Sequence, residues 1–237
     1  MSTAFYDSLA PHFREYAGRR RAYLDTVDDL VARGLRGRTL LDVGSGDGVR
    51  ILGIARRAGI EQITLSEPSG EMRRRCHEAD LLPGARVVDV RAEDLDRLEG
   101  RFDNITCLWN VLGHVESSGA RVRALRAMAA RLAPGGALQF DVNNRYNIRA
   151  YGWASVARER WRDWWHPARP NGERAVEIVI GGTIVRGHGY LFNRGEVDAM
   201  VAEAGLRVIR SVAVDYSTGE IRSTPYGGQL FYQVERG

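Results

Sequence analysis

The sequence contains no lysine, so arginine supplies all 34 of its Lys+Arg positions. Because there are 30 acidic residues, the formal net charge is only +4. Proteins that bind nucleic acids usually concentrate their basic side chains on one face or along one helix. Here the arginines are scattered and many stand beside Asp or Glu, a pattern that arginine-rich coding explains. We therefore expect no nucleic-acid partner.

Cysteines and long apolar runs are also scarce. Cys76 and Cys107 lie far apart in the chain, and we expect them to be reduced core thiols of a cytoplasmic protein. No apolar run approaches the roughly 20 residues that a membrane span needs, and the N-terminal segment lacks the apolar centre of a signal peptide. No His/Cys cluster has metal-ligand spacing. These absences predict no membrane partner and no metal site, and the 237 residues suit one α/β domain with an insertion or cap.

A glycine-rich turn follows the first segment that reads as a buried strand. Residues 39–43 are short, apolar and β-leaning, residues 44–48 read GSGDG, and Val49–Arg57 has helical spacing. Glycines let the backbone pass close to a ligand, and the start of a helix presents unpaired N–H groups at the same place. The stretch predicts the ligand crevice of an open α/β sheet.

The chemistry of this turn favours a cationic ligand. A dinucleotide fingerprint needs Gly or Ala at the position of Val49, and the carboxylate of Asp42 would repel a pyrophosphate. S-adenosylmethionine (SAM) instead carries a sulfonium and an ammonium group. A hydrophobic pair followed by D-x-G-x-G-x-G resembles the first motif of class I SAM-dependent methyltransferases.

Three further motifs, in the right order, carry the same resemblance. Glu67 ends a second strand about twenty residues beyond the glycine turn, where a carboxylate accepts the hydroxyls of a ribose. Residues 67–72, EPSGEM, are similar to the second motif, in which a Met packs on the adenine. A third strand over 85–90 precedes residues 91–95, and Arg91 stands where many relatives have the Asp that takes the adenine amino group. That amino group would then go to Glu93, Asp94 or a backbone carbonyl. The turn LAPGG at 132–136 precedes a fifth strand over 137–142.

The resemblance implies an α/β fold. We expect a Rossmann-like, seven-stranded and mostly parallel sheet with an antiparallel last strand, helices on both faces and a small cap inserted after strand 5. The expected divisions are an N-terminal helical lid (1–38, with helices over 4–16 and 20–32), a SAM-binding domain (39–142 and 191–237) and a substrate cap (143–190). Within the cap, the spacing predicts an aromatic helix over 148–165 and a hairpin of strands 175–180 and 183–190.

The resemblance also implies a set of cofactor residues. Tyr16 and Arg20 in the lid would meet the methionine end of SAM, with Arg19 and Arg21 as alternatives, because the planar fork of an arginine suits a carboxylate. The expected set is Tyr16, Arg20, Asp42, Gly44, Ser45, Gly46, Glu67, Pro68, Met72, Ala92, Glu93, Leu108 and Asn110.

The acceptor side is expected after the fourth strand and in the cap. The run C-L-W-N at 107–110 with His114 is similar to glycine N-methyltransferase-like enzymes. A hydroxyl acceptor needs a general base, whereas an amine needs only to arrive neutral. We expect catalytic roles for His114 and Tyr146, and expect most of the cap's tryptophans to pack on the core while one or two line the pocket. The expected substrate-binding residues are Asn110, Asn144, Trp153, Trp164, His188 and Tyr226.

The function these features favour is SAM-dependent methyl transfer, by SN2 attack, to nitrogen or oxygen of a small-molecule metabolite. An RNA or protein methyltransferase is the alternative, although no N/D-P-P-Y/F run follows the fourth strand. A SAM-binding protein without turnover is a third possibility. A dinucleotide oxidoreductase is disfavoured by Asp42 and Val49. The expected assembly is a monomer or a homodimer.

Overall fold

The computed structural model describes residues 3–166 and 171–237. Residues 1–2 of the expected lid and 167–170 of the expected cap lie outside the described residues.

The main sheet confirms the predicted fold class. Within the described residues eight strands lie in the order β3-β2-β1-β4-β5-β10-β8-β9. Their bounds are β1 Thr39–Val43, β2 Gln62–Ser66, β3 Arg86–Val88, β4 Phe102–Cys107, β5 Leu132–Val142, β8 Leu206–Val214, β9 Ile221–Arg222 and β10 Gln229–Arg236. Strands β1 to β5 pair in parallel, and β10 runs antiparallel between β5 and β8. The predicted number of strands, seven, is one fewer than the structure shows, because residues 221–222 form β9, which pairs with β8 at the edge of the sheet.

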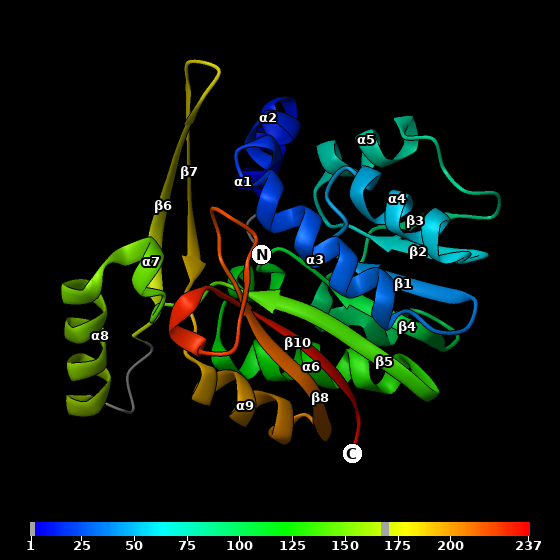
Figure 1. Cartoon of the computed structure of the whole chain (residues 1–237). Coiled ribbons are helices and arrows are strands. Elements are labelled where there is room, and N and C mark those ends of the chain that lie inside the picture. The colour runs from blue at the N-terminus through cyan, green and yellow to red at the C-terminus, as the bar shows by residue number, and fades with distance from the viewer. Residues whose placement is uncertain (1–2, 167–170) are drawn as a thin grey trace.

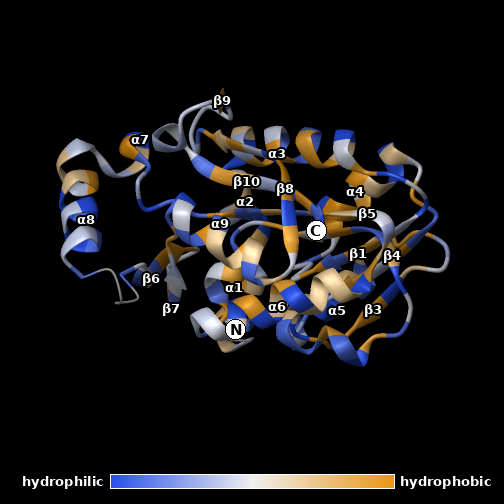
Figure 2. Cartoon of the chain, turned by 90° about the horizontal axis from the view of Figure 1, so that it is seen from below, coloured by the Kyte–Doolittle hydropathy of each residue, from blue (hydrophilic) through white to orange (hydrophobic). Residues whose placement is uncertain are grey.

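Helices cover both faces of this sheet (Figures 1 and 2). The helices α3 (Arg21–Gly34) and α4 (Val49–Ala58) lie on one face, and α6 (Ser118–Arg131) and α9 (Arg194–Glu203) on the other. The helix α5 (Gly70–Glu78) begins at Ser69, whose hydroxyl caps it. The apolar stripe of α3, including Tyr23, Val27 and Val31, is buried beside α4 and over β5 and β8. Each face therefore has its own core, and the carboxyl ends of the parallel strands remain free for a ligand.

The N-terminal segment forms more pieces than expected. Instead of one helix over 4–16, it has α1 (Thr3–Leu9), a 3-10 turn (Ala10–His12) and α2 (Phe13–Gly18). Pro11 lies in the turn and has no N–H to donate, which interrupts the helix. Asp7 of α1 accepts hydrogen bonds from the Ser69 hydroxyl (2.6 Å) and the Glu71 N–H (3.2 Å) at the start of α5.

The cap has the predicted hairpin but a broken helix. The strands β6 (Glu173–Ile180) and β7 (Thr183–Tyr190) pair antiparallel, and both turn residues, Gly181 and Gly182, have positive φ (54° and 75°). The aromatic segment forms α7 (Ile148–Tyr151) and α8 (Trp153–Trp165), separated at Gly152. Phe5 and Leu9 of α1 pack on the hairpin, which stands beside α1 and α2 in Figure 1, while α8 projects from the body. Among the described helices, none combines the length and hydropathy that crossing a bilayer requires.

Candidate functional site

A cavity of about 380 Å³ lies over the glycine turn at the end of β1, within the range of about 300–1,000 Å³ common for small-molecule sites. Its walls come from this turn, from the ends of β2 and β4, and from α1, α2, α3 and α4. Gly44 has a φ of 74°, and a Cβ added there would lie 2.5 Å from a methyl group of Val111. The turn therefore requires glycine for both its conformation and its packing.

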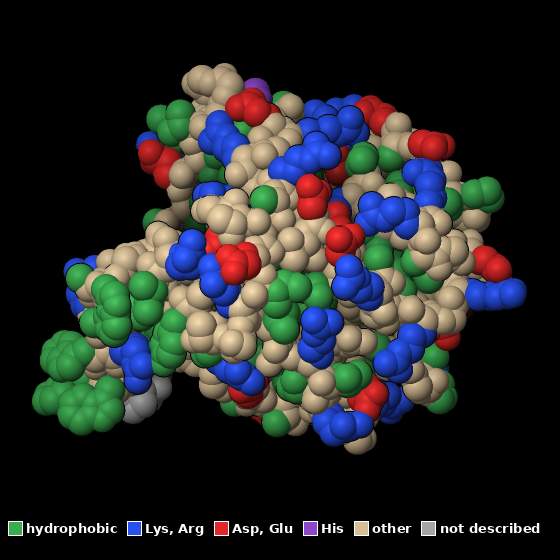
Figure 3. Space-filling view, in the orientation of Figure 1, with side chains coloured by type: hydrophobic (Ala, Val, Ile, Leu, Met, Phe, Trp, Pro, Cys, Tyr) green, Lys and Arg blue, Asp and Glu red, His purple; other side chains and the backbone are tan. Residues whose placement is uncertain are grey.

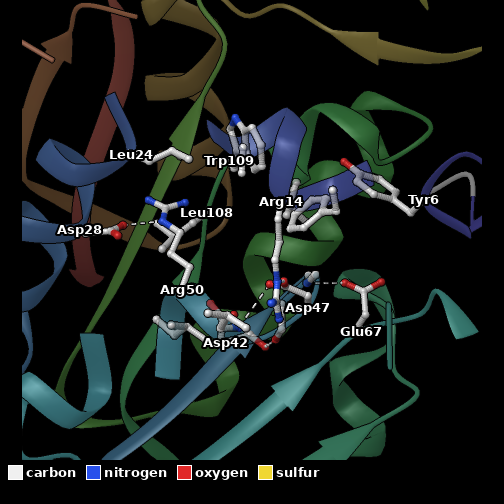
Figure 4. A pocket seen from close by; sticks show the side chains of 18 of the residues that line it. Tyr6, Arg14, Leu24, Asp28, Asp42, Asp47, Arg50, Glu67, Leu108 and Trp109 are labelled. Atoms are coloured by element: carbon white, nitrogen blue, oxygen red, sulfur yellow. Dashed lines mark hydrogen bonds and ion pairs between the residues drawn. The ribbon is translucent and has the colours of Figure 1, made fainter. Parts of the chain in front are cut away.

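Three buried carboxylates, those of Asp42, Asp47 and Glu67, line this cavity, and two of them have raised pKa values (Figure 4). Glu67 accepts hydrogen bonds from the backbone N–H groups of Gly46 and Ser69, both at 2.8 Å, and burial raises its pKa to about 7. Asp42 accepts from the Thr106 hydroxyl at 2.5 Å, and burial raises its pKa to about 6. Burial opposes the charged form in each case. A positively charged ligand would favour ionisation of both groups, so the site suits a cation.

Arginine side chains border the same cavity but not in the predicted way. Arg20 does not line it, because its guanidinium lies over the ring of Tyr216, 4.4 Å from the centroid. Its expected alternative Arg21 does line the cavity. Sequence reasoning missed Arg14, which pairs with Asp47 at 2.9 Å. In Figure 4 Arg14 reaches down to Asp47 beside the glycine turn.

Arg50 is the second arginine that sequence reasoning missed. It stands in the first turn of α4, lines the cavity and forms an ion pair with Asp28 of α3 (Figure 4). Its Nη2 atom is buried without a hydrogen-bond partner in the described part of the chain. A buried, unpaired guanidinium nitrogen is costly unless something occupies it. Since Arg50 lines the cavity, its guanidinium suits the carboxylate of a ligand.

A strained pair of residues forms the wall at the end of β4. Trp109 and Asn110 have φ values of 60° and 61°, the left-handed conformation that few non-glycine residues adopt. Asp141 holds them: its carboxylate accepts the Trp109 N–H at 2.5 Å, and its carbonyl accepts the Asn110 N–H at 3.2 Å. The Tyr23 hydroxyl donates to the same carboxylate at 2.5 Å. Strain of this kind concentrates at functional sites.

A second, smaller cavity of about 80 Å³ lies behind this wall, between α1, α2 and β7. It shares three aromatic residues, Tyr6, Phe13 and Trp109, with the larger cavity. Tyr16 lines it and stacks on Trp109, with centroids 5.2 Å apart. The two cavities are therefore neighbours that share an aromatic wall.

His114 lines the second cavity in a defined tautomer. Its Nδ1 lies 3.1 Å from the carbonyl oxygen of His188. A carbonyl only accepts, so Nδ1 carries the hydrogen and Nε2 keeps a lone pair. Burial lowers the pKa of His114 to about 4, and the ring packs against Phe5 and Tyr6. His114 is thus neutral near pH 7, and its Nε2 can accept a hydrogen bond.

The structure brings together about half of the predicted site residues. Those lining the larger cavity are Asp42, Gly44, Ser45, Gly46, Glu67 and Leu108. Those lining the second cavity are Tyr16, Asn110 and His114. Those lining neither are Arg20, Pro68, Met72, Ala92, Glu93, Asn144, Tyr146, Trp153, Trp164, His188 and Tyr226.

The expected adenine residues are placed in the protein interior. Met72 and Ala92 are buried in the hydrophobic core, and a carboxylate oxygen of Glu93 is buried with no partner among the described residues. Tyr6 of α1 lines the cavity beside Glu67, and Asp7 binds the start of α5. The N-terminal helix therefore packs against the start of α5, next to the expected adenine residues.

The predicted polar residues at the start of the cap hold the cap in place. Tyr146 donates its hydroxyl to Asp163 at 2.5 Å, and Asn144 donates to the carbonyl of Gly228 at 2.9 Å. The Tyr226 hydroxyl accepts from Arg160 at 2.6 Å. The polar groups of these three residues are engaged between the cap and the C-terminal loop, and none of the three lines either cavity.

His188, Trp153 and Trp164 also lie away from the site. Neighbouring residues of a strand face opposite sides, so while Gly189 of β7 faces the second cavity, the His188 side chain is exposed. Trp153 and Trp164 of α8 are each 73% exposed. A segment rich in aromatic residues predicts a buried surface, but it does not show which side of the helix is buried. The tryptophans of α8 face solvent.

Comparisons with known proteins fit this geometry. Residues 13–211 match a family model described as a methyltransferase domain. The chain is 35% identical over 136 residues to a ubiquinone biosynthesis O-methyltransferase of Alkalilimnicola ehrlichii, covering 55% of this chain and 53% of that protein. The chain thus spans about half the length of the curated relatives it matches.

Two solved structures show the same fold. The CcbJ methyltransferase from Streptomyces caelestis superposes with a TM-score of 0.68 at 15% identity, covering 92% of this chain and 90% of that one. SAM-bound CalS10, an amino pentose methyltransferase from Micromonospora echinaspora, gives a TM-score of 0.59 at 21% identity, covering 94% and 96%.

Proposed function

The chain belongs to the methyltransferase domain family, as its resemblance to class I SAM-dependent methyltransferases predicted, and from this premise we propose that it methylates a hydroxyl group of a small molecule. The observation that carries the proposal is the pair of adjoining cavities. The larger cavity has carboxylates and arginines that match the charged groups of SAM. The second cavity has a neutral histidine beside an aromatic wall.

The larger cavity fits SAM by its donors and acceptors. Glu67 would accept the ribose hydroxyls, and the guanidinium of Arg50 would donate to the amino-acid carboxylate. Asp42 provides negative charge near the sulfonium and ammonium groups. When bound, SAM supplies an activated methyl group, so the protein needs chiefly to align it with the acceptor and exclude water.

The second cavity would hold the reacting end of the acceptor, because its volume of about 80 Å³ lies below the roughly 300–1,000 Å³ common for a whole small-molecule site. Its aromatic walls suit a flat or apolar molecule. As the acceptor oxygen attacks the methyl carbon, its proton would pass to Nε2 of His114, while the carbonyl of His188 holds the ring through Nδ1. The name of the curated relative, an O-methyltransferase, supports oxygen over nitrogen as the nucleophile.

A labelling experiment tests this proposal. The protein is incubated with methyl-labelled SAM and a bacterial extract separated into small molecules, RNA and protein, and Glu67→Ala serves as the binding-deficient control. We expect label in the small-molecule fraction, with an alkali-stable O-methyl product identified by mass spectrometry. Label in RNA or protein would contradict the proposal. SAM binding without label in any fraction would contradict turnover of a common metabolite and favour a binding protein.

A further inference from the structure

The outer face of α8 is an unusual concentration of exposed aromatic surface. Trp153 and Trp164 are 73% exposed, Trp161 is 60% exposed and Trp165 is 58% exposed. They also contact one another: the rings of Trp161 and Trp165 stack at 5.8 Å, and those of Trp164 and Trp165 lie 5.7 Å apart. In Figure 3 these side chains form the green patch at the lower left, on the projecting end of the molecule. Large exposed apolar patches usually mark a binding surface.

Helical spacing places these four tryptophans on one side. Positions 153, 157, 161 and 164 follow the i, i+4, i+8, i+11 spacing of a single stripe, which Trp165 widens. Val156 is the buried residue of this helix. We call the outward stripe, Trp153, Trp161, Trp164 and Trp165, the tryptophan face.

The acidic side chains and the exposed basic side chains of α8 lie on different sides of the helix. Both of its carboxylates point inward into ion pairs, Asp163 with Arg145 at 2.7 Å and Glu159 with Arg174 at 2.9 Å. Arg158, in contrast, is exposed at the margin of the tryptophan face, and Arg160, also exposed, donates to the Tyr226 hydroxyl at 2.6 Å. Within α8, all of whose residues the structure describes, the outward side thus carries positive charge and no acid.

We propose that the tryptophan face docks the protein on the surface of an anionic lipid bilayer. Indole rings favour the interface between lipid tails and headgroups, and arginines at the rim of an amphipathic helix pair with lipid phosphates. Docking of this kind needs no membrane-spanning helix, so it is compatible with the lengths of the described helices. The proposal revises the expectation that the protein has no membrane partner. A second copy of the chain fits less well, because a symmetric contact through this face would bring Arg158 near its own counterpart.

Vesicle flotation tests this proposal without any methyl acceptor. The full chain is mixed with vesicles of phosphatidylcholine alone or with 30% phosphatidylglycerol, at about 0.1 M and 0.5 M salt. We expect binding to the anionic vesicles, weakening at high salt. Trp161→Ala/Trp165→Ala should lower the partition coefficient about tenfold or more, and Arg158→Gln about fivefold on anionic vesicles only.

Matched controls separate docking from misfolding. Val179→Ala removes an equally exposed apolar side chain from β6, and Arg86→Gln removes an exposed arginine from β3 at the far edge of the sheet; both should bind vesicles like the parent protein. All variants should keep the parent affinity for SAM. Absence of vesicle binding, or equal binding by the double tryptophan variant, would overturn the proposal. Self-association that the double variant abolishes, with no vesicle binding, would assign the face to a contact between copies instead.

Discussion

At the scale of single residues, the pKa of Glu67 makes SAM binding pH-dependent. Because the pKa of this carboxyl is raised to about 7, it is largely protonated at pH 6 and ionised at pH 8. A ligand that needs the carboxylate should bind about tenfold more weakly for each pH unit below the pKa. Calorimetric titration of SAM between pH 6 and 8 measures this slope. Glu67→Gln should bind weakly with a much flatter profile, and the exposed Glu71→Gln should keep the parent profile; a parent affinity independent of pH would contradict the assignment.

Arg50 is a second residue with a defined expectation. Arg50→Ala removes a guanidinium from the cavity wall, and losing a hydrogen bond to a charged group costs about 1.5–3 kcal/mol. The dissociation constant of SAM should therefore rise about 10- to 100-fold, whereas S-adenosyl compounds lacking the carboxylate should lose much less. Arg57→Ala, on the same helix but exposed, is the matched control. Equal losses with and without the ligand carboxylate would mean that Arg50 acts only through its pairing with Asp28.

The assignment of His114 concerns turnover rather than binding. Once an acceptor is known, His114→Ala should lower kcat about 10²- to 10⁴-fold, the usual contribution of a general base, and leave SAM affinity unchanged. Since burial lowers the pKa of His114 to about 4 in the free protein, kcat/KM of the parent enzyme should not fall between pH 8 and 5 through titration of this group. Rapid-quench measurements of kcat and kcat/KM provide the check. An unaffected rate in the variant would assign His114 to packing alone.

At the scale of secondary-structure elements, Asp7 joins α1 to the start of α5 beside the larger cavity, and we expect α1 to act as a lid over that cavity. Asp7→Ala removes the bonds to Ser69 and Glu71 and should shift α1 toward an open state. We expect SAM association about five- to tenfold faster, measured by stopped-flow fluorescence of Trp109. Glu15→Ala, at an exposed lid carboxylate that pairs with Arg19, should leave the rate unchanged. A slower rate in Asp7→Ala would indicate that α1 helps to form the site rather than to cover it.

The elements also show which parts of the structure the sequence determines locally. Three features depend on residues only a few positions apart, and all three were predictable. They are the turn at 44–48, the hairpin turn at 181–182 and the N-cap of α9 at Asn193. The direction of a side chain in the cap depends on what packs against it from distant segments. His188 and the tryptophans of α8 were therefore misplaced, and Arg50 was overlooked because its partner Asp28 lies 22 residues away.

At the scale of the whole molecule, SAM should stabilise the fold by binding only its native state. At a concentration 100 times its dissociation constant, a ligand adds about 2.7 kcal/mol. For a chain of this size each kcal/mol corresponds to about 2–4 °C in Tm, so SAM should raise Tm by about 5–10 °C in differential scanning fluorimetry. The same concentration should leave the Tm of Glu67→Ala nearly unchanged, and a parent protein without a shift would argue against SAM as its ligand.

The aromatic wall shared by the two cavities has a kinetic consequence. Tyr6, Phe13 and Trp109 belong to both cavities, and two of them lie on the N-terminal helices that line the first. Under the proposed function, the acceptor cavity is completed only when those helices have settled over the larger one. Binding should then follow a compulsory order, in which SAM enters before the acceptor and demethylated SAM leaves last. This product should inhibit the enzyme competitively with respect to SAM, and not competitively with respect to the acceptor.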